Sequence, residues 1–292
     1  MNYPTLIKLS AIVSLGLSPM LAQAQFELPE TDIWQIALSG DNSKPQPLIS
    51  RRGYDNQPHY STGGGTLYFT QGDDEGYTDI AALDLNSGSI RTITHTPLSE
   101  FSPTPLADGR LAMVQVQQDG EQWLVAMQPD GSAPERILPA TMVGYFAALP
   151  DQSWATFIVS EPSVLSYWPA SASAASPTSA AQTWASDIGR TLLVAGDALY
   201  YPQADQRNVY LYRRQLTDAA PQPLMPLPEQ RQDFALGPDG AIWIALDSRL
   251  YQWSDMHQRW QLWRDLRADG IQQISRLTIS SDGRFMAVVT HP

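Results

Sequence analysis

Phe234-Ala-Leu-Gly-Pro-Asp-Gly-Ala-Ile-Trp-Ile-Ala245 has the pattern of a β-strand, a tight turn and a second strand. Phe234 and Leu236 alternate with small residues before the turn, as the residues of a half-buried strand do. The turn itself has a physical basis, because Pro238 presets φ to about −65° and Gly240 adopts a positive φ without steric cost. The stretch therefore predicts a β-hairpin.

The same hairpin recurs along the chain. Close copies are Leu106-Ala-Asp108-Gly109-Arg-Leu-Ala-Met and Ile279-Ser-Ser-Asp282-Gly283-Arg-Phe-Met-Ala, and looser copies surround Gly64, Asp151 and Asp197. Together with Asp239, these turns lie 44, 43, 46, 42 and 43 residues apart. A period of roughly 40–45 residues built from short strands is typical of a β-propeller with one blade per repeat. The sequence thus predicts an all-β, six-bladed β-propeller.

The two ends of the chain are expected to share a blade. Residues 31–38 alternate like a strand and residues 46–49 form a second, whereas the last repeat offers only the strands 274–279 and 284–290. If the N-terminal pair completes that repeat, the ring closes without an exposed sheet edge. We therefore expect the last blade to contain strands from both termini.

Composition limits the possible partners. The formal net charge of −12 argues against nucleic acid and anionic lipid, both of which need a basic surface. It leaves proteins with basic patches, cations and neutral ligands as candidates. The chain has no Cys, which excludes disulfides, thiol chemistry and lipidation at a Cys.

Residues 1–24 have the features of a secretory signal peptide. Lys8 is their only charge, residues 9–17 are a short apolar core, and Ala22-Gln23-Ala24 fits the cleavage rule. The apolar core is too short to span a hydrocarbon layer of roughly 30 Å. We expect residues 25–292 to be a soluble, monomeric periplasmic protein. Within them, the low-complexity residues 169–183 favour a flexible loop inside blade three over a linker between domains.

Two repeats resemble the TolB-type propeller family, whose repeats are WD-like. The first contains Asn56-Gln-Pro-His-Tyr-Ser61, Thr66-Leu-Tyr-Phe-Thr-Gln71 and Asp79-Ile-Ala-Ala-Leu-Asp-Leu85, and the second Ser102-Pro-Thr-Pro-Leu-Ala-Asp-Gly109 with Arg136-Ile-Leu138. The resemblance covers residues 25–292, and implies a periplasmic ring with a protein-binding face. TolB proper carries an α/β domain before its propeller. We expect none here, since the strand pattern begins close to the predicted cleavage site.

The sequence offers little that could perform catalysis. There is no G-x-S-x-G motif, and no metal-ligand spacing links the four histidines, so we predict no catalytic residue, metal or cofactor and favour a protein that is not an enzyme. An acidic stretch at residues 73–75 with Asp79 could hold Ca²⁺, but a solvated hairpin tip explains it better. The histidines are His59, His95, His257 and His291.

Charged residues precede the first strand of most blades. Since first strands line a propeller channel, four acids could form a ring at its mouth and attract a cation or a basic segment of a partner. Ordinary solvation and capping of backbone N–H groups is the alternative. The predicted partner-binding residues are Asp55, Asn56, Glu100, Phe101, Asp187, Arg190, Asp233 and Arg276.

Three functions are compatible with these features. The first is a protein-binding scaffold of the cell envelope that uses the channel mouth and loops. The second is a Ca²⁺-dependent propeller hydrolase of the lactonase type, for which Asp55, Asn56, Glu100 and Asp187 are the available ligands. The third is a small-ligand sensor with an aromatic channel, which Tyr60, Phe101, Tyr145 and Phe234 would permit.

Overall fold

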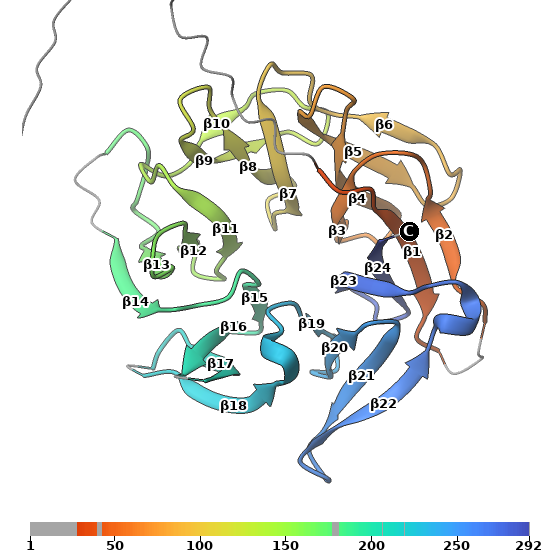
Figure 1. Ribbon diagram of the computed structural model, residues 1–292. Coiled ribbons are helices and arrows are strands. Elements are labelled where there is room, and N and C mark those ends of the chain that lie inside the picture. The colour runs from red at the N-terminus through yellow and green to blue at the C-terminus, as the bar shows by residue number, and fades with distance from the viewer. Residues whose placement is uncertain (1–27, 40–42, 177–180, 206, 219, 292) are drawn as a thin grey trace, which may run out of the picture.

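The computed structural model describes residues 28–39, 43–176, 181–205, 207–218 and 220–291. These residues form six four-stranded antiparallel sheets arranged in a ring around a central axis (Figure 1). The six-bladed β-propeller predicted from the repeat is confirmed. The predicted signal peptide lies outside the described residues.

Each blade places its first strand nearest the central axis. Blade one consists of β3 (Asp55–Tyr60), β4 (Thr66–Gly72), β5 (Thr78–Asp84) and β6 (Ile90–Thr92). Blade two consists of β7 (Ser99–Pro105), β8 (Leu111–Val116), β9 (Gln122–Met127) and β10 (Glu135–Arg136). Blade three consists of β11 (Val143–Ala148), β12 (Trp154–Ile158), β13 (Val164–Trp168) and β14 (Gln182–Ser186).

The remaining blades follow the same order. Blade four consists of β15 (Leu193–Ala195), β16 (Ala198–Asp205), β17 (Asn208–Gln215) and β18 (Gln222–Leu227). A short 3₁₀ turn, η1 (Pro228–Gln230), leads to blade five, which consists of β19 (Ala235–Leu236), β20 (Ile242–Leu246), β21 (Arg249–Ser254) and β22 (Arg259–Asp265). After η2 (Arg267–Asp269), blade six contains β23 (Gln273–Ile279), β24 (Phe285–His291), β1 (Asp32–Ala37) and β2 (Gln46–Ile49).

Blade six closes the ring with strands from both ends of the chain. β1 pairs with β24 in continuous antiparallel register, from Asp32 opposite Thr290 to Ala37 opposite Phe285. The expected sharing of the last blade is confirmed. Because β1 supplies the third strand of the sheet begun by β23 and β24, backbone hydrogen bonds within blade six tie the segment that leads into blade one to the C-terminal strands.

The hairpin between the first two strands of a blade is stabilised by an aspartate. Its side-chain Oδ1 accepts a hydrogen bond from the backbone N–H two residues later, at 3.0–3.1 Å in four blades. In three of them the intervening residue is a glycine with φ between 71° and 87°, a conformation in which other residues are strained. Because these contacts lie within two residues of each aspartate, the repeat of about 43 residues can be recognised from the sequence. The aspartates are Asp108, Asp151, Asp239 and Asp282.

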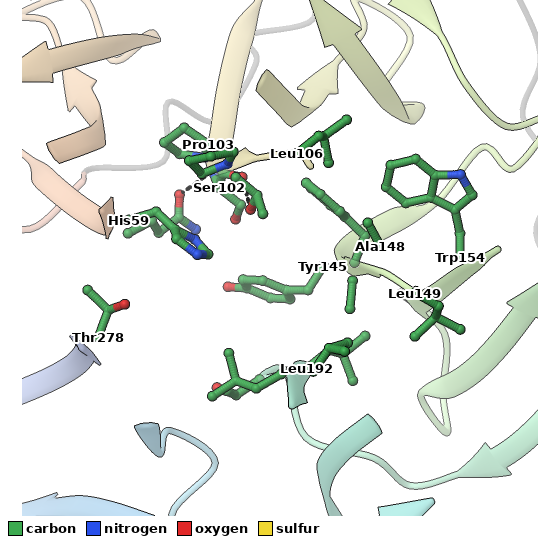
Figure 2. A pocket seen from close by; sticks show the side chains of 18 of the residues that line it. His59, Ser102, Pro103, Leu106, Tyr145, Ala148, Leu149, Trp154, Leu192 and Thr278 are labelled. Carbon is green, nitrogen blue, oxygen red and sulfur yellow. Dashed lines mark hydrogen bonds between the residues drawn. The ribbon is translucent and has the colours of Figure 1, made fainter. Parts of the chain in front are cut away.

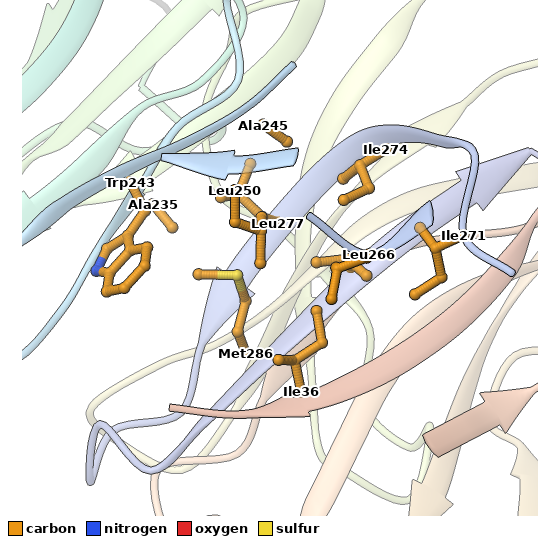
Figure 3. Packing of buried hydrophobic residues seen from close by; sticks show 11 residues of the cluster. Ile36, Ala235, Trp243, Ala245, Leu250, Leu266, Ile271, Ile274, Leu277 and Met286 are labelled. Carbon is orange, nitrogen blue, oxygen red and sulfur yellow. The ribbon is translucent and has the colours of Figure 1, made fainter. Parts of the chain in front are cut away.

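The core of the described chain consists of six clusters of buried hydrophobic residues, each shared by two neighbouring blades. Between blades five and six, Ile36 of β1 and Met286 of β24 pack against Leu250 and Leu266 (Figure 3). Between blades six and one, Ile33 of the same β1 packs with residues of β3 and β4. The N-terminal strand therefore contributes to the core at two junctions.

The low-complexity residues 169–183 cover the segment that joins β13 to β14 and the first two residues of β14. The described part of this segment carries turn hydrogen bonds, and the Ala174 N–H donates to the Ile137 carbonyl in blade two at 2.9 Å. Residues 177–180 lie outside the described residues. The flexibility of this loop remains a prediction.

Truncation of Ile36 tests the contribution of the closing strand. Ile36 is fully buried, so Ile36→Ala removes apolar surface and leaves a cavity between blades five and six, which lowers the free energy of unfolding by about 2–4 kcal/mol. Urea denaturation measures this loss. Leu262→Ala is the matched control, because Leu262 is 54% exposed and its truncation changes stability by less than about 0.5 kcal/mol. Equal losses in the two variants would contradict a closing role for β1.

Candidate functional site: the central channel

A cavity of about 890 Å³ occupies the centre of the ring. It is lined by residues in or beside all six inner strands β3, β7, β11, β15, β19 and β23. At one end it reaches the face that carries the first hairpin turns, where the exposed residues Asp108 and Gln152 line it. Representative lining residues from the six blades are His59, Ser102, Tyr145, Leu193, Phe234 and Thr278.

Arg276 and Tyr145 form a bridge across the channel. They belong to blades six and three, which lie opposite each other in the ring (Figure 1). Arg276 Nη2 donates a hydrogen bond of 2.8 Å to Tyr145 Oη, and the guanidinium carbon lies 5.4 Å from the centroid of the tyrosine ring. Gln57 and these two residues line both the large cavity and a second one of about 250 Å³. The bridge therefore marks the boundary between the two cavities.

β-bulges in the inner strands direct side chains into the channel. The pairing register shifts between Asn56 and His59 in β3, and equivalent shifts occur in β7, β11 and β23. Gln57 and Ser102 have φ values of 53° and 58° at the first two shifts. Gln57 Oε1 accepts hydrogen bonds of 2.8 Å from the Ser102 N–H and from Thr70 Oγ1, so the bulges of blades one and two are tied together.

Two arginines and one aspartate meet at the start of the inner strands of blades four to six. Arg190 donates from Nε to Asp233 Oδ1 at 3.2 Å and from Nη2 to Oδ2. Thr191 Oγ1 also donates to Asp233 Oδ1, at 3.3 Å, and Arg276 Nη1 lies 3.6 Å from the same oxygen. The sequence placed these three charged residues at the channel mouth, and the structure brings them together. The charges of Arg190, Asp233 and Arg276 sum to one positive charge.

Asp55 is fully buried at the start of β3. Its Oδ1 accepts from Arg51 Nη2 at 2.8 Å and from Nε at 3.2 Å, and its backbone is tied to the Thr31 hydroxyl. Its Oδ2 is buried without a partner in the described structure. Burial raises the pKa of Asp55 to about 6, against the lowering effect of Arg51. Its carboxylate therefore serves the packing of the N-terminal segment rather than the channel surface.

Glu100 is fully buried at the equivalent position of β7. Its Oε1 accepts from Thr96 Oγ1 at 2.5 Å and from Gln115 Nε2 at 3.0 Å, while Oε2 is buried without a partner among the described residues. Burial raises its pKa as well. The expectation of exposed carboxylates at these two positions is corrected, because both side chains point into packed interior instead of the channel mouth.

The other predicted residues have separate environments. Asn56 is buried, and its Oδ1 accepts from the Gln57 N–H at 2.7 Å. Phe101 lines the smaller cavity. Asp187 is exposed and has a φ of 55°, in a connector that reaches β15 only at Leu193. The Asp187 carbonyl accepts a hydrogen bond from the Ala204 N–H of β16 at 2.8 Å, and Ile188 forms an isolated antiparallel bridge with Gln203, so the inner pairing of blade four begins directly after Asp187, as expected. A partner-binding role for these eight residues as a set remains a prediction.

Ligands for a metal are dispersed in the described part of the chain. No three His, Cys, Asp or Glu side chains among the described residues are placed to share an ion. The carboxylates considered for Ca²⁺ each have their own partners or lie apart, as described above. His59 lines the cavity, and burial lowers its pKa to about 4, so that it is a neutral polar group at pH 7.

Several channel residues were not anticipated from the sequence. Gln57 and Ser102 were missed, as was an apolar extension of the cavity between blades two and three. The signal that could have found the first two is the proline that follows each of them, Pro58 and Pro103. A proline inside a strand pattern marks a bulge, and bulges re-aim side chains.

The buried carboxyl of Asp55 predicts an inverted pH dependence. Its pKa in the folded state exceeds the ordinary value, so its stabilising contribution is present below about pH 4 and is lost as the pH rises through about 6. We expect the free energy of unfolding of the wild type to fall, relative to Asp55→Asn, by roughly 1–3 kcal/mol between about pH 4 and pH 7. Urea unfolding at the two pH values measures the difference.

Asp282→Asn is the control for a carboxyl whose contribution hardly changes between about pH 4 and pH 7. Hydrogen bonds from Ser280 and Arg284 lower the pKa of Asp282 to about 2. Its contribution is therefore present above the ordinary pKa and is lost as the pH falls towards about 2. Its difference from the wild type should therefore stay nearly constant between the two pH values, and a change as large as that of Asp55→Asn would show that burial of Asp55 is not the cause.

Comparison with known proteins supports the fold. No protein-family model matches the sequence, and no curated protein matches it. Among solved structures, a TolB-type protein from Agrobacterium tumefaciens has a TM-score of 0.69 at 12% identity, over 90% of this chain and 98% of that one. TolB from Acinetobacter baumannii has a TM-score of 0.56 at 13% identity, over 90% of this chain and 64% of that one.

A third similar structure is an enzyme. Oligogalacturonate lyase from Vibrio parahaemolyticus has a TM-score of 0.55 at 12% identity, over 85% of this chain and 80% of that one. No helix in the described residues has the length and hydrophobicity to cross a membrane. At these identities the comparisons establish the architecture, and the resemblance to TolB-type propellers predicted from the repeat is confirmed as a likeness of fold.

Proposed function

We propose that this chain is a periplasmic binding protein of the cell envelope, and that its central cavity receives a segment of a partner protein. The observation that carries the proposal is the cavity itself, which is lined by all six blades and reaches the face formed by the first hairpin turns. Its volume of about 890 Å³ lies towards the upper end of the ~300–1,000 Å³ typical of ligand pockets.

The lining suits a peptide. The cavity is lined by apolar residues such as Phe146 and Leu149 and by the polar side chains of Gln57, His59 and Thr278. A peptide presents backbone donors and acceptors together with apolar side chains, so a mixed lining can satisfy both. The fold likeness to TolB structures agrees with such a role in the envelope, and the predicted signal peptide provides the route there.

The enzymatic alternative has weaker support. A metal-dependent propeller enzyme would need convergent carboxylate or histidine ligands, and those considered from the sequence do not converge in the described structure. The likeness to oligogalacturonate lyase concerns the fold alone. A basic partner segment, as first predicted, has less support than a binding cavity as such, because Asp55 and Glu100 are buried.

Site-specific photo-cross-linking tests the proposal. A photoreactive residue replaces Thr278 inside the cavity, and the variant is expressed in the periplasm of the source bacterium. We expect covalent capture of a defined protein and, by peptide mapping, of one segment of it. The same photoreactive residue at Arg259, an exposed position on the outer strand of blade five, is the matched control and should not capture that segment.

The outcomes separate the alternatives. Capture from Thr278 alone would support a protein-binding channel. Equal capture from both positions, or no protein adduct from either, would contradict it. If neither position captured a protein, a rise in melting temperature with small periplasmic solutes would favour the small-ligand sensor instead.

A further inference from the structure

The cavity has two chemically different ends. Figure 2 shows Leu106, Ala148, Leu149 and Trp154 grouped on the side that blades two and three provide. All four line the cavity, and three of them also belong to or pack against the hydrophobic cluster of that junction. We call these four residues the apolar arm. Its surface can accept an aliphatic or aromatic side chain without displacing polar contacts.

The other end is cationic. Arg276 has a mostly buried side chain, 17% exposed, and lines both cavities. A guanidinium has five N–H donors, and the hydrogen bond to Tyr145 uses one of them. The nearest carboxylate oxygen, on Asp233, lies 3.6 Å from Nη1, which is longer than a hydrogen bond. Among the described residues, only one of the Arg276 donors therefore has a hydrogen-bond acceptor, and the side chain lines the cavity.

Asp233 cannot neutralise both arginines. Its two oxygens are engaged by the fork of Arg190, and one of them also accepts from Thr191. A bidentate arginine–carboxylate pair is the stronger arrangement, so Asp233 is chiefly the partner of Arg190. Asp55 and Glu100, which the sequence also suggested for the channel mouth, do not offset Arg276, because both are buried with other partners and neither lines the cavity. Arg276 is thus the surplus cation of the channel.

We propose that the cavity binds the free C-terminal carboxylate of a partner peptide at Arg276, with an apolar side chain of the same peptide in the apolar arm. The inference rests on the proposed peptide-binding function and specifies which part of the partner is bound. The planar fork of a guanidinium matches a carboxylate in geometry. The single negative charge of a C-terminus also matches the single excess positive charge of Arg190, Asp233 and Arg276.

The spacing of the two ends sets the register of the peptide. Tyr145, which contacts Arg276, and Ala148 of the apolar arm are both on β11 and three residues apart. At about 3.3 Å per residue they are separated by ~10 Å along the strand. An extended peptide covers this distance in about three residues. The apolar side chain is therefore expected about three positions before the terminal residue.

Peptide pools with free and blocked ends test the carboxylate. The purified protein is offered a pool of randomised hexapeptides with free C-termini and the same pool as C-terminal amides, and retained peptides are sequenced. We expect retention of the free acids to exceed that of the amides by tenfold or more, with apolar residues enriched about three positions from the end. Equal retention of acids and amides, or none of either, would overturn the inference.

Charge variants distinguish binding from a structural role. Arg276→Met should weaken binding of the selected acid tenfold or more. Asp233→Asn, which releases Arg190 from its carboxylate, should strengthen it. A merely structural role for the cluster would predict weaker binding in both. Arg259→Gln, on the outer strand of blade five, should bind as the wild type does, and thermal melting verifies that each variant is folded.

Competition identifies the anion. Acetate should displace the selected peptide at lower concentration than inorganic phosphate does. The reverse order would assign the site to a phosphate group and overturn the inference. Failure here is distinguishable from failure of the proposed function: capture of a partner through Thr278 without dependence on a free carboxylate would leave the proposed function intact. Conversely, retention that depends on a free carboxylate, together with no protein captured through Thr278, would support the anion site and contradict the proposed protein partner.

Discussion

Closure of the ring is the constraint on which the rest of the molecule depends. Each blade buries apolar surface against two neighbours, so the core is continuous only if blade six meets blade one. The pairing of β1 with β24 achieves this. The same closure sets the width of the channel and places Arg276 within hydrogen-bond distance of Tyr145, which lies 131 residues earlier in the chain. A ring that opened at this seam would lose both the core at two junctions and the bridge across the channel.

The cavity is shaped by departures from regular strand geometry. Ideal inner strands would alternate their side chains between the two faces of each sheet, and would leave few groups directed along the channel. The bulges in β3, β7, β11 and β23 change that alternation locally. Gln57 then bridges two blades, while Tyr145 and Arg276 follow directly after the bulges in theirs. Regular repeats thus build the scaffold, and local irregularities create the features available for recognition.

The sequence was informative where the chemistry is local. Asp239 and Gly240 specify a turn through contacts within a few residues, and a repeated turn specifies a repeated blade. The sequence did not indicate which of the charged side chains are buried. Asp55 and Asp233 occupy similar positions before inner strands, yet Asp55 is enclosed beside Arg51 and Thr31 while Asp233 faces the channel with Arg190. That difference depends on how distant segments pack, which no short pattern encodes.

The net charge of the chain was similarly a poor guide to the sign of the charge inside the channel. The chain carries −12, which favoured cations or basic segments as ligands. At physiological ionic strength, however, exposed charges farther than about 8 Å are largely screened, so a group inside the cavity responds mainly to its neighbours. Those neighbours include Arg276 but neither Asp55 nor Glu100, since burial has removed both carboxyls from the cavity surface. An acidic protein can therefore offer a locally cationic site, and the buried acids are part of the reason that it does.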